Sequence, residues 1–450
     1  MGPSLLVFPQ ILFIPCGRQK RKVFSLEARD YFTVKENEGA YWQILEDGTL
    51  FEGYLTSISG LSALLSSLSD NTADTPYKVS IDDSADDFEA LLDGVNPELA
   101  SNEKYVWLSF KDSDFTKLEG TFSEYVTCLT IPAQVTSLGF IDGAGIQRFK
   151  VASGNEHFAV SGTVLCSKDL NILYRWPPAS PATVGTIPAN IHSIADGAFA
   201  NCRNIKEFNV LEGNSYFKVT TGDIANTSSA YSAYQMVKYF EVDSSIPEAP
   251  ADTSSDEWWD WYNSYSNKFS LQHKNGFAPL PLLTSADGKT LLAIPPALSL
   301  LTIADLKAQY GDYTTDQIEN PVTYSADKAV VLKFDTVCPY AMCGVQNIES
   351  ITLNVTAASL PAYTFRDCLV LKSVDLSHTG NTIGEYTFSD CTALEYVRFI
   401  SESINTVESN AFYGCTALKS LWFLAGESAG TVAPDAYPST CSVTISGQTN

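Results

Sequence analysis

A spacing of 23 or 24 residues recurs along the second half of the sequence, and it constrains the fold more than any other feature. One apolar position of this pattern is filled in turn by Met342, Phe365, Phe388 and Phe412. A small apolar residue stands three positions after each of them: Val345, Cys368, Cys391 and Cys415. A unit this short cannot bury its apolar side chains alone, whereas stacked units bury them in one continuous core. The sequence therefore predicts a solenoid.

Within each unit the spacing of the apolar residues changes from three to two. Phe388, Cys391 and Leu394 lie three residues apart, which fits one side of a short helical or 3₁₀ turn. Val397 and Phe399 alternate as residues do in a strand. Stacking such units aligns their strands in one parallel sheet, so the expected fold is an α/β-type solenoid.

Two further copies lie upstream of this run. Residues 194–210 form a clear copy, and residues 135–151 form a weaker one in which Phe140 takes the phenylalanine position. The segment from residue 187 to residue 202 reads IPANIHSIADGAFANC. It resembles the BspA-type leucine-rich repeat, whose consensus is a variant of I-P-x-x-V-x-x-I-x-x-x-A-F-x-x-C-x-x-L-x-x-I-x-L-P. The resemblance covers most of residues 121–425 and implies a right-handed leucine-rich repeat coil with parallel strands.

Proteins of this family often carry hairpin insertions, and two segments of the chain resemble them. Residues 155–177 match one hairpin, and a second hairpin opens at Asn214 and resumes near Ser285. The repeat also fits poorly over residues 302–335, where we expect the solenoid to be interrupted. Residues 24–118 lack the repeat but show strand-like and helical patterns, so we interpret them as an α+β cap on the N-terminal end of the coil.

These patterns divide the chain into six segments. They are a candidate leader (1–23), the N-terminal cap (24–118), a first repeat block with its hairpin (119–222), an aromatic-rich insertion (223–282), a second repeat block (283–425) and a C-terminal cap (426–450). The apolar run at residues 5–16 is shorter than the roughly 20 residues of a membrane-spanning helix. A basic cluster follows this run, whereas a secretory leader carries its charge first. Cys16 is a candidate lipid anchor although Pro15 precedes it, so a secreted and a lipidated N-terminus both stay open.

The charge balance and the motifs exclude several function classes. The chain has 28 Lys and Arg against 52 Asp and Glu, a net charge of −24, which repels nucleic acid. Residues 426–430 match G-x-S-x-G, but Pro434 follows where a hydrolase would have a helix. None of the four histidines stands at metal-binding spacing from another. We therefore expect a monomer that is not an enzyme, with no catalytic residue, metal or cofactor.

The cysteines follow the repeat. The chain has ten, and four of them share one repeat position: Cys202, Cys368, Cys391 and Cys415. Val345 and Gly143 fill the same position in other copies, which a disulfide or a metal site would not tolerate. We expect these thiols to be buried and to pack as small apolar groups.

Outward-facing strand positions provide the first candidate binding site. One column of these positions alternates in charge, so its members should pair across neighbouring strands: Glu349, Lys372, Glu395 and Lys419. The next columns bring together Tyr396, Arg398 and Trp422. Tyr, Trp and Arg are the residues enriched in the hot spots of protein interfaces.

The insertion provides the second candidate. Five aromatic residues lie close together in it: Trp258, Trp259, Trp261, Tyr262 and Tyr265. Ser254 and Glu257 form a capping-box pair, which predicts a helix beginning at Ser255. All but Trp259 fall on one stripe of this helix, and the favoured interpretation is that the stripe docks the helix onto the solenoid. The alternative is an aromatic platform for a sugar or a partner protein.

Two hypotheses about function follow. The first is a secreted or surface-attached bacterial protein that binds a macromolecule on the strand face without catalysis. Adhesion is what the family resemblance implies, because BspA-type proteins include adhesins and antigens of bacteria and protozoa. The second is a glycan-binding module centred on the tryptophans of the insertion. An enzyme that uses acidic residues of the insertion is a third and weaker alternative.

Overall fold

The computed structural model describes residues 32–37, 40–45, 50–55, 59–81, 88–110, 115–221, 232–241, 246–265, 272–311, 325–378, 382–400, 406–423, 431–441 and 444–447. The candidate leader, Cys16 and the G-x-S-x-G segment lie outside these ranges. The chain divides into two compact units. One contains Met1–Gly139 and Lys150–Asn155, and the other contains Phe140–Phe149 and Glu156–Asn450.

The first unit is built on a sheet of seven strands. In sheet order these are β1 (Phe32–Asn37), β2 (Ala40–Leu45), β3 (Leu50–Leu55), β4 (Tyr77–Ile81), β5 (Val106–Phe110), β7 (Val126–Ile131) and β9 (Arg148–Val151). β1 to β3 pair antiparallel, whereas β3 to β7 pair parallel. A separate pair joins β6 (Lys117–Thr121) to β8 (Ser137–Asp142).

Each of the two described helices of the first unit buries the apolar residues of one side. α1 (Ser59–Ser66) buries Leu61, Leu64 and Leu65. α2 (Phe88–Asn102) buries its apolar side and begins at Phe88, whose ring lies 5.2 Å from that of Phe110 in β5 and 4.7 Å from that of Phe115. This aromatic cluster attaches the start of α2 to the sheet.

The second unit contains two hairpins of the expected kind. In the first, β10 (Phe158–Ser161), β11 (Val164–Ser167) and β12 (Ile172–Arg175) pair antiparallel, and β12 runs parallel to β14 (Ser193–Ile194). In the second, β16 (Phe217–Thr221), β19 (Pro281–Ser285), β20 (Thr290–Ala293) and β22 (Thr336–Val337) repeat the same order. Between the two, β13 (Val184–Ile187) pairs with β15 (Glu207–Val210). Because β16 pairs directly with β19, the chain between them is an insertion into the hairpin.

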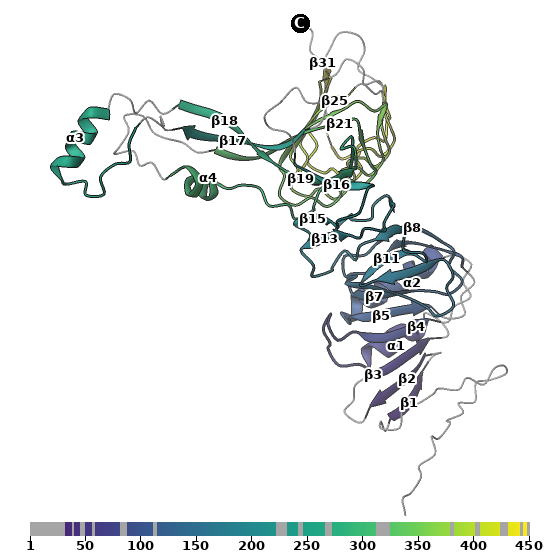
Figure 1. The fold of residues 1–450 in the computed structure, drawn as a ribbon. Coiled ribbons are helices and arrows are strands. Elements are labelled where there is room, and N and C mark those ends of the chain that lie inside the picture. The colour runs from purple at the N-terminus through teal and green to yellow at the C-terminus, as the bar shows by residue number, and fades with distance from the viewer. Residues whose placement is uncertain are drawn as a thin grey trace, which may run out of the picture. The chain divides into compact units, whose positions relative to one another are not determined.

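The largest sheet has eight strands and carries the repeats (Figure 1). In sheet order they are β18 (Gln272–Pro279), β17 (Ser232–Glu241), β21 (Ser325–Phe334), β23 (Ser350–Val355), β25 (Ser373–His378), β27 (Tyr396–Phe399), β29 (Ser420–Phe423) and β31 (Thr444–Gly447). β21 to β31 pair parallel, one repeat per strand, and β17 pairs antiparallel with both β18 and β21. The fold is therefore a solenoid with a parallel sheet, as predicted.

Short strands of two residues form a second parallel sheet in the same turns. They are β24 (Ser359–Leu360), β26 (Thr382–Ile383), β28 (Thr406–Val407) and β30 (Thr431–Val432). The region that fits the repeat poorly holds α4 (Ile303–Tyr310) and β21. Leu306 of α4 is buried against Val237 of β17, so α4 covers one face of the strands that the insertion adds.

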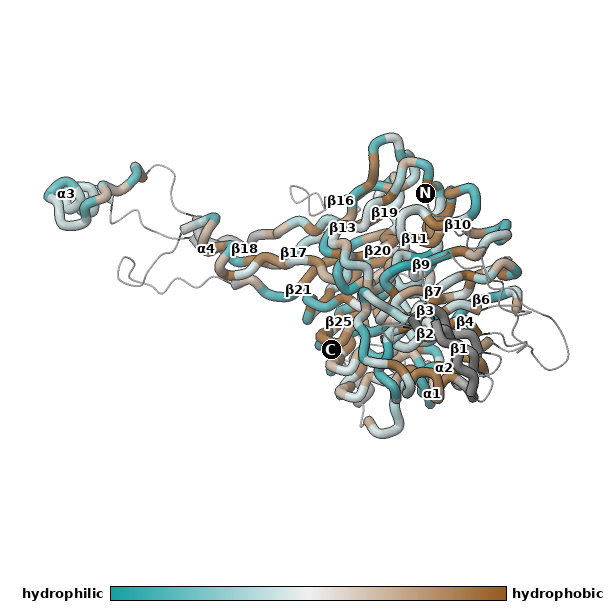
Figure 2. The backbone as a smooth tube through the Cα atoms, turned by 90° about the horizontal axis from the view of Figure 1, so that it is seen from below, coloured by the Kyte–Doolittle hydropathy of each residue, from teal (hydrophilic) through white to brown (hydrophobic). Residues whose placement is uncertain are grey.

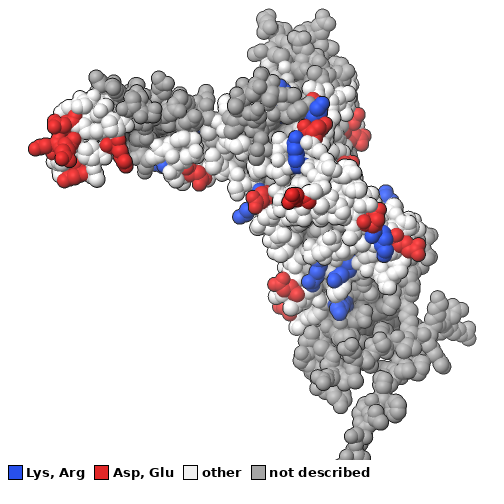
Figure 3. Space-filling model, in the orientation of Figure 1, with Lys and Arg blue, Asp and Glu red and all other residues white. Residues whose placement is uncertain are grey.

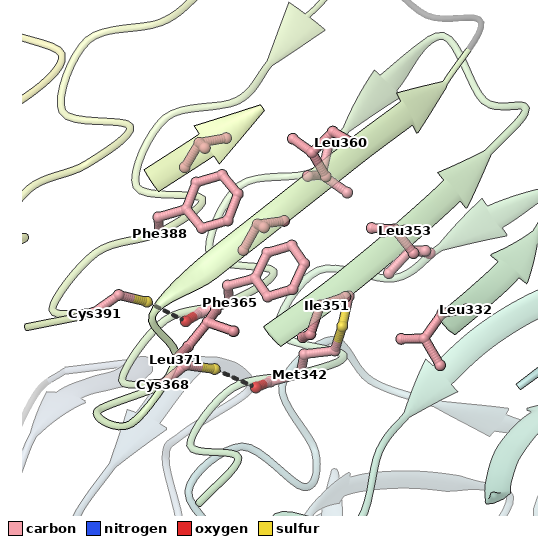
Figure 4. Packing of buried hydrophobic residues seen from close by; sticks show 14 of the residues in the cluster. Leu332, Met342, Ile351, Leu353, Leu360, Phe365, Cys368, Leu371, Phe388 and Cys391 are labelled. Atoms are coloured by element: carbon pink, nitrogen blue, oxygen red, sulfur yellow. Dashed lines mark hydrogen bonds between the residues drawn. The ribbon is translucent and has the colours of Figure 1, made fainter. Parts of the chain in front are cut away.

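Equivalent residues of successive turns stack on one another in the core (Figure 4). The ring of Phe388 lies 4.8 Å from that of Phe365 and 5.1 Å from that of Phe412, both nearly parallel. The thiols of Cys368 and Cys391 each donate a hydrogen bond to a carbonyl of the preceding turn at 3.0 Å. The expected burial of the repeat cysteines is confirmed, and their thiols also link consecutive turns.

Each turn also contains backbone conformations that the spacing does not reveal. Tyr340, Tyr363 and Tyr386 occupy equivalent positions with φ between 54° and 60°, a backbone region that residues other than glycine seldom adopt. Their rings stack, 4.9 Å apart for the first pair and 5.3 Å apart for the second. The stack provides one source of stability that offsets the backbone strain.

The structure corrects the position of Phe140 in the weak copy. The core position there belongs to Ile141, which is buried, whereas Phe140 is half-exposed and stacks on Tyr340 at 4.3 Å. The equivalent of the tyrosines in the intervening turn is Gly197, with φ of 71°. The Phe140 ring takes the space beside it, since a Cβ on Gly197 would lie 2.7 Å from that ring. Phe140 therefore completes the tyrosine stack from the turn on the other side of Gly197.

We predict that Phe388→Ala lowers the free energy of unfolding by about 3–5 kcal/mol, because it removes a buried ring from the middle of the stack. Urea denaturation followed by circular dichroism measures the change. Leu369→Ala is the control, because Leu369 is 50% exposed, and its effect should stay within about 0.5 kcal/mol. Equal effects of the two changes would contradict a core built from stacked turns.

We predict that Gly197→Ala destabilises the protein more than Gly162→Ala does. Both glycines have a positive φ, 71° and 64°, so both variants carry a backbone strain of about 1 kcal/mol. Only at Gly197 does the new Cβ collide with a ring, which adds about 1–3 kcal/mol. Thermal melting of the two variants compares them, and the same shift in Tm for both would show that the Phe140 ring imposes no constraint.

Candidate binding surfaces

The outward side of the eight-stranded sheet is called here the strand face. Strand register places Arg398 of β27 between Asp375 of β25 and Trp422 of β29. Tyr396 lies two residues before Arg398 and therefore on the same side of the sheet. The core residues Val397 and Phe399 alternate with them and point inward. The structure thus brings Tyr396, Arg398 and Trp422 together on one rigid surface.

Ion pairs cross the strand face in the alternating column. Lys372 Nζ lies 2.6 Å from Glu349 Oε2, and Lys419 Nζ lies 2.5 Å from Glu395 Oε2. Hydrogen bonds from these lysines hold the pKa of both carboxyl groups below the usual value. Lys328 adds a third contact, 3.0 Å from Glu349. Pairing across neighbouring strands is as the sequence predicts, and each exposed pair contributes at most about 1 kcal/mol.

Arg398 and Tyr396 are both exposed but held in place. The guanidinium of Arg398 makes a two-pronged contact with the Asp375 carboxylate, with Nε donating to Oδ1 at 2.5 Å and Nη2 to Oδ2. This hydrogen bonding raises the pKa of Arg398 above its usual value. Tyr396 is 46% exposed, and Lys419 Nζ lies 5.7 Å from the centre of its ring. A fixed guanidinium beside aromatic rings can bind a partner at a small cost in side-chain entropy.

Two aromatic residues of the strand face escaped the sequence analysis. Tyr234 of β17 pairs in register with Val331 of β21. Val331 in turn belongs to the row of register partners that crosses the sheet, strand by strand, to Arg398 and Trp422. Its ring makes an edge contact with Phe277 of β18 at 4.6 Å. The strand face therefore continues onto the insertion. The alternating apolar residues of β17 predict a strand. The repeat pattern does not predict that this strand pairs with β21.

The aromatic helix of the insertion is α3 (Asp256–Tyr265), in the connection between β17 and β18 (Figure 1). The Ser255 hydroxyl accepts a hydrogen bond from the Trp258 backbone, so Ser255 caps the helix. The predicted cap, Ser254, is one residue too early. Ser254 instead donates to the Asp252 carboxylate at 2.6 Å.

The interpretation that the stripe docks α3 onto the solenoid is wrong for this structure, because none of the residues of α3 is buried. The rings pack on one another instead: Trp258 stacks on Tyr262 at 5.2 Å and meets Trp259 edge-on at 5.2 Å. Trp261 Nε1 donates to the Pro247 carbonyl at 2.9 Å. Trp259 is 52% exposed. Figure 2 colours α3 white to teal, the intermediate and hydrophilic part of the scale.

Among the described residues we assign no disulfide, metal site or membrane-spanning helix. The nine cysteines among them are free thiols, and burial raises the pKa of Cys202 to about 12. No group of three or more His, Cys, Asp and Glu side chains in the described ranges is placed to hold a metal ion. Within the same ranges no helix is both long and apolar enough to cross a membrane.

Comparison with known proteins agrees with the repeat. Residues 181–221 and 333–438 match the BspA type leucine rich repeat region in six copies. The chain therefore carries BspA-type leucine-rich repeats, as the sequence resemblance implied. The weak copy at residues 135–151 lies outside this match. No curated protein matches the sequence.

Several solved structures are similar to the chain. A leucine-rich repeat protein from Eubacterium ventriosum is 13% identical, with a TM-score of 0.33 over 91% of this chain and 94% of that one. The pneumococcal vaccine antigen PcpA is 12% identical, with a TM-score of 0.35 over 92% and 93%. A leucine rich cell surface protein from Faecalibacterium prausnitzii is 13% identical, with a TM-score of 0.32 over 89% and 97%. The repeat assignment rests on the family match and the strand register.

Proposed function

We propose that this protein is a secreted or surface-attached bacterial adhesin that binds a macromolecular partner on its strand face, without catalysis. The supporting observation is the fixed cluster of Tyr396, Arg398 and Trp422 on neighbouring strands. Residues 24–118 and 426–450 cap the coil in this proposal, and Cys16 is its candidate lipid anchor. Stacked repeats suit this role because they give an extended surface that does not need a cleft.

The electrostatics of the strand face favour recognition over chemistry. Asp375 is engaged by Arg398, and Glu395 by Lys419, so these acids are held as ion pairs and not as free proton donors. The face thus carries paired charges of both signs on a chain whose net charge is −24. A folded protein surface with mixed charge fits such a face better than a polyanion does.

A glycan is the second candidate ligand, and the observation that favours it is the exposure of Trp259. An exposed tryptophan beside other aromatic rings provides an apolar surface of the kind that binding sites use. In this alternative the binding site is α3, with Trp258, Trp259 and Trp261, and the strand face has no role.

We predict that Trp422→Ala weakens binding to a protein ligand about tenfold or more, as loss of a hot-spot residue does. The measurement is surface plasmon resonance of the full chain against immobilised extracellular-matrix proteins. Tyr413→Ala is the control, because Tyr413 is 55% exposed and packs on Tyr386 in the turns, away from the sheet strands. Unchanged binding of the Trp422 variant would refute the strand face as the site.

We predict that Trp259→Ala leaves protein binding unchanged, because Trp259 belongs to α3 and not to the strand face. A glycan array probed with the wild-type chain and with this variant tests the alternative. Sugar binding that disappears in Trp259→Ala and persists in Trp422→Ala would replace the adhesin proposal with the glycan module.

A further inference from the structure

The outward side of the insertion strands carries a second apolar cluster, called here the hairpin cluster. Its members are Tyr234, Met236, Phe277 and Val331. Met236 and Phe277 are opposite one another in the β17–β18 pair, and Tyr234 is opposite Val331 in the β17–β21 pair. All four are half-exposed. Aromatic residues and methionine are enriched in the central parts of protein interfaces.

The two sides of these strands differ in what covers them. Gln235 and Val237 alternate with the cluster and are buried, and Val237 packs against Leu306 of α4. The amide of Gln235 donates to the Leu301 carbonyl at 2.9 Å and accepts from the Leu301 backbone at 2.8 Å. These contacts cover the inward side of β17 with α4 and the residues just before it. Burial also raises the pKa of the Tyr234 hydroxyl, which agrees with a ring packed against the sheet surface.

Register links the hairpin cluster to the site already proposed. The row that begins at Tyr234 continues through Val331, Thr352, Asp375, Arg398 and Trp422. Five strand spacings of about 4.8 Å separate its two ends, a span of about 24 Å. The middle of the row is polar, and the two ends are apolar and aromatic. One sheet thus holds two aromatic clusters at the two ends of a single row.

We propose that the hairpin cluster is a second contact site of the strand face, and that the partner is a folded protein that touches both ends at once. This inference rests on the proposed function, since it extends the same face. A span of about 24 Å agrees with the roughly 800 Å² that each partner buries in a stable protein complex. The outward columns of the face carry both signs of charge with an excess of two cations: Lys328, Lys333, Lys372, Arg398 and Lys419 against Glu349, Asp375 and Glu395.

The insertion gains a role from this proposal. It adds β17 and β18 to the edge of the repeat sheet and so widens the binding face beyond the repeats. Figure 3 shows acidic side chains over α3 with no Lys or Arg among them on the side in view, in contrast to the mixed charge of the strand face. The two surfaces of the insertion therefore suit different partners.

The experiment measures binding of the full chain to the immobilised extracellular-matrix proteins used for Trp422→Ala, with Tyr234→Ala, Tyr234→Phe and the double variant Tyr234→Ala/Trp422→Ala. We expect Tyr234→Ala to weaken binding about tenfold and Tyr234→Phe to leave it nearly unchanged, because the ring and not the hydroxyl makes the contact. Sites this far apart should act independently, so the double variant should lose about a hundredfold.

The variants distinguish failure of the inference from failure of the proposed function. Loss of binding in Trp422→Ala with wild-type binding in Tyr234→Ala would overturn the hairpin cluster and keep the strand face. Loss in Tyr234→Ala counts only if the variant melts at the wild-type temperature, and Met236→Ala provides a second, smaller truncation of the same cluster. Binding of a soluble oligosaccharide that depends on Tyr234 would overturn the protein partner.

Discussion

Every turn of this coil depends on its neighbours to bury its apolar side chains. Phe388 is covered on both faces by the equivalent residues of adjacent turns, at 4.8 Å and 5.1 Å. The thiol of Cys391 reaches the Phe365 carbonyl of the preceding turn at 3.0 Å. Since the same few positions satisfy the core in each turn, the outward positions are free to vary. The outward surface can therefore change without changing the fold.

The coil also tolerates a large insertion, because the turns on either side of it still stack. Asn201 donates to the Asp367 carboxylate at 2.8 Å although 166 positions separate them. Arg366 lies 3.3 Å from Asp142, and the Phe140 ring stacks on Tyr340 at 4.3 Å. These contacts join turns that the inserted chain separates in sequence. The insertion leaves the coil after β16, adds β17 and β18 to the sheet beside β21, and returns as β19.

Much of the fold could be predicted because the repeat has a strict period. The period places Phe365, Cys368 and Val374 at the core positions of their turn, and the hairpin motifs locate β10 to β12 and the break between β16 and β19. The positive φ of Tyr340, Tyr363 and Tyr386 could not be predicted, since the apolar pattern carries no information on backbone angles. Phe140 was misplaced because Ile141 beside it is equally apolar, and only packing against Gly197 distinguishes the two.

The candidate sites differ in the same way. Tyr396, Arg398 and Trp422 could be grouped from the sequence, because parallel strands one period apart share a register. Tyr234 could not be grouped with them, because β17 joins the sheet antiparallel, with a bulge between Gln235 and Val237, and no period relates it to the repeats. The docking of α3 was predicted from its stripe alone, yet the aromatic rings of a helix this short also pack on one another, as Trp258 and Tyr262 do.

Rigidity is the physical reason to place recognition on the sheet. Tyr396 and Arg398 stand on a strand that is hydrogen-bonded to a neighbour on each side, and Arg398 is fixed further by Asp375. Binding then orders few side chains, and less of the contact energy is lost to entropy. α3 lies in the connection between β17 and β18 and has no buried residue, so its side chains do not share the support that the sheet gives to the strand face. Because binding on the sheet loses less entropy, the strand face is the proposed site and α3 the alternative.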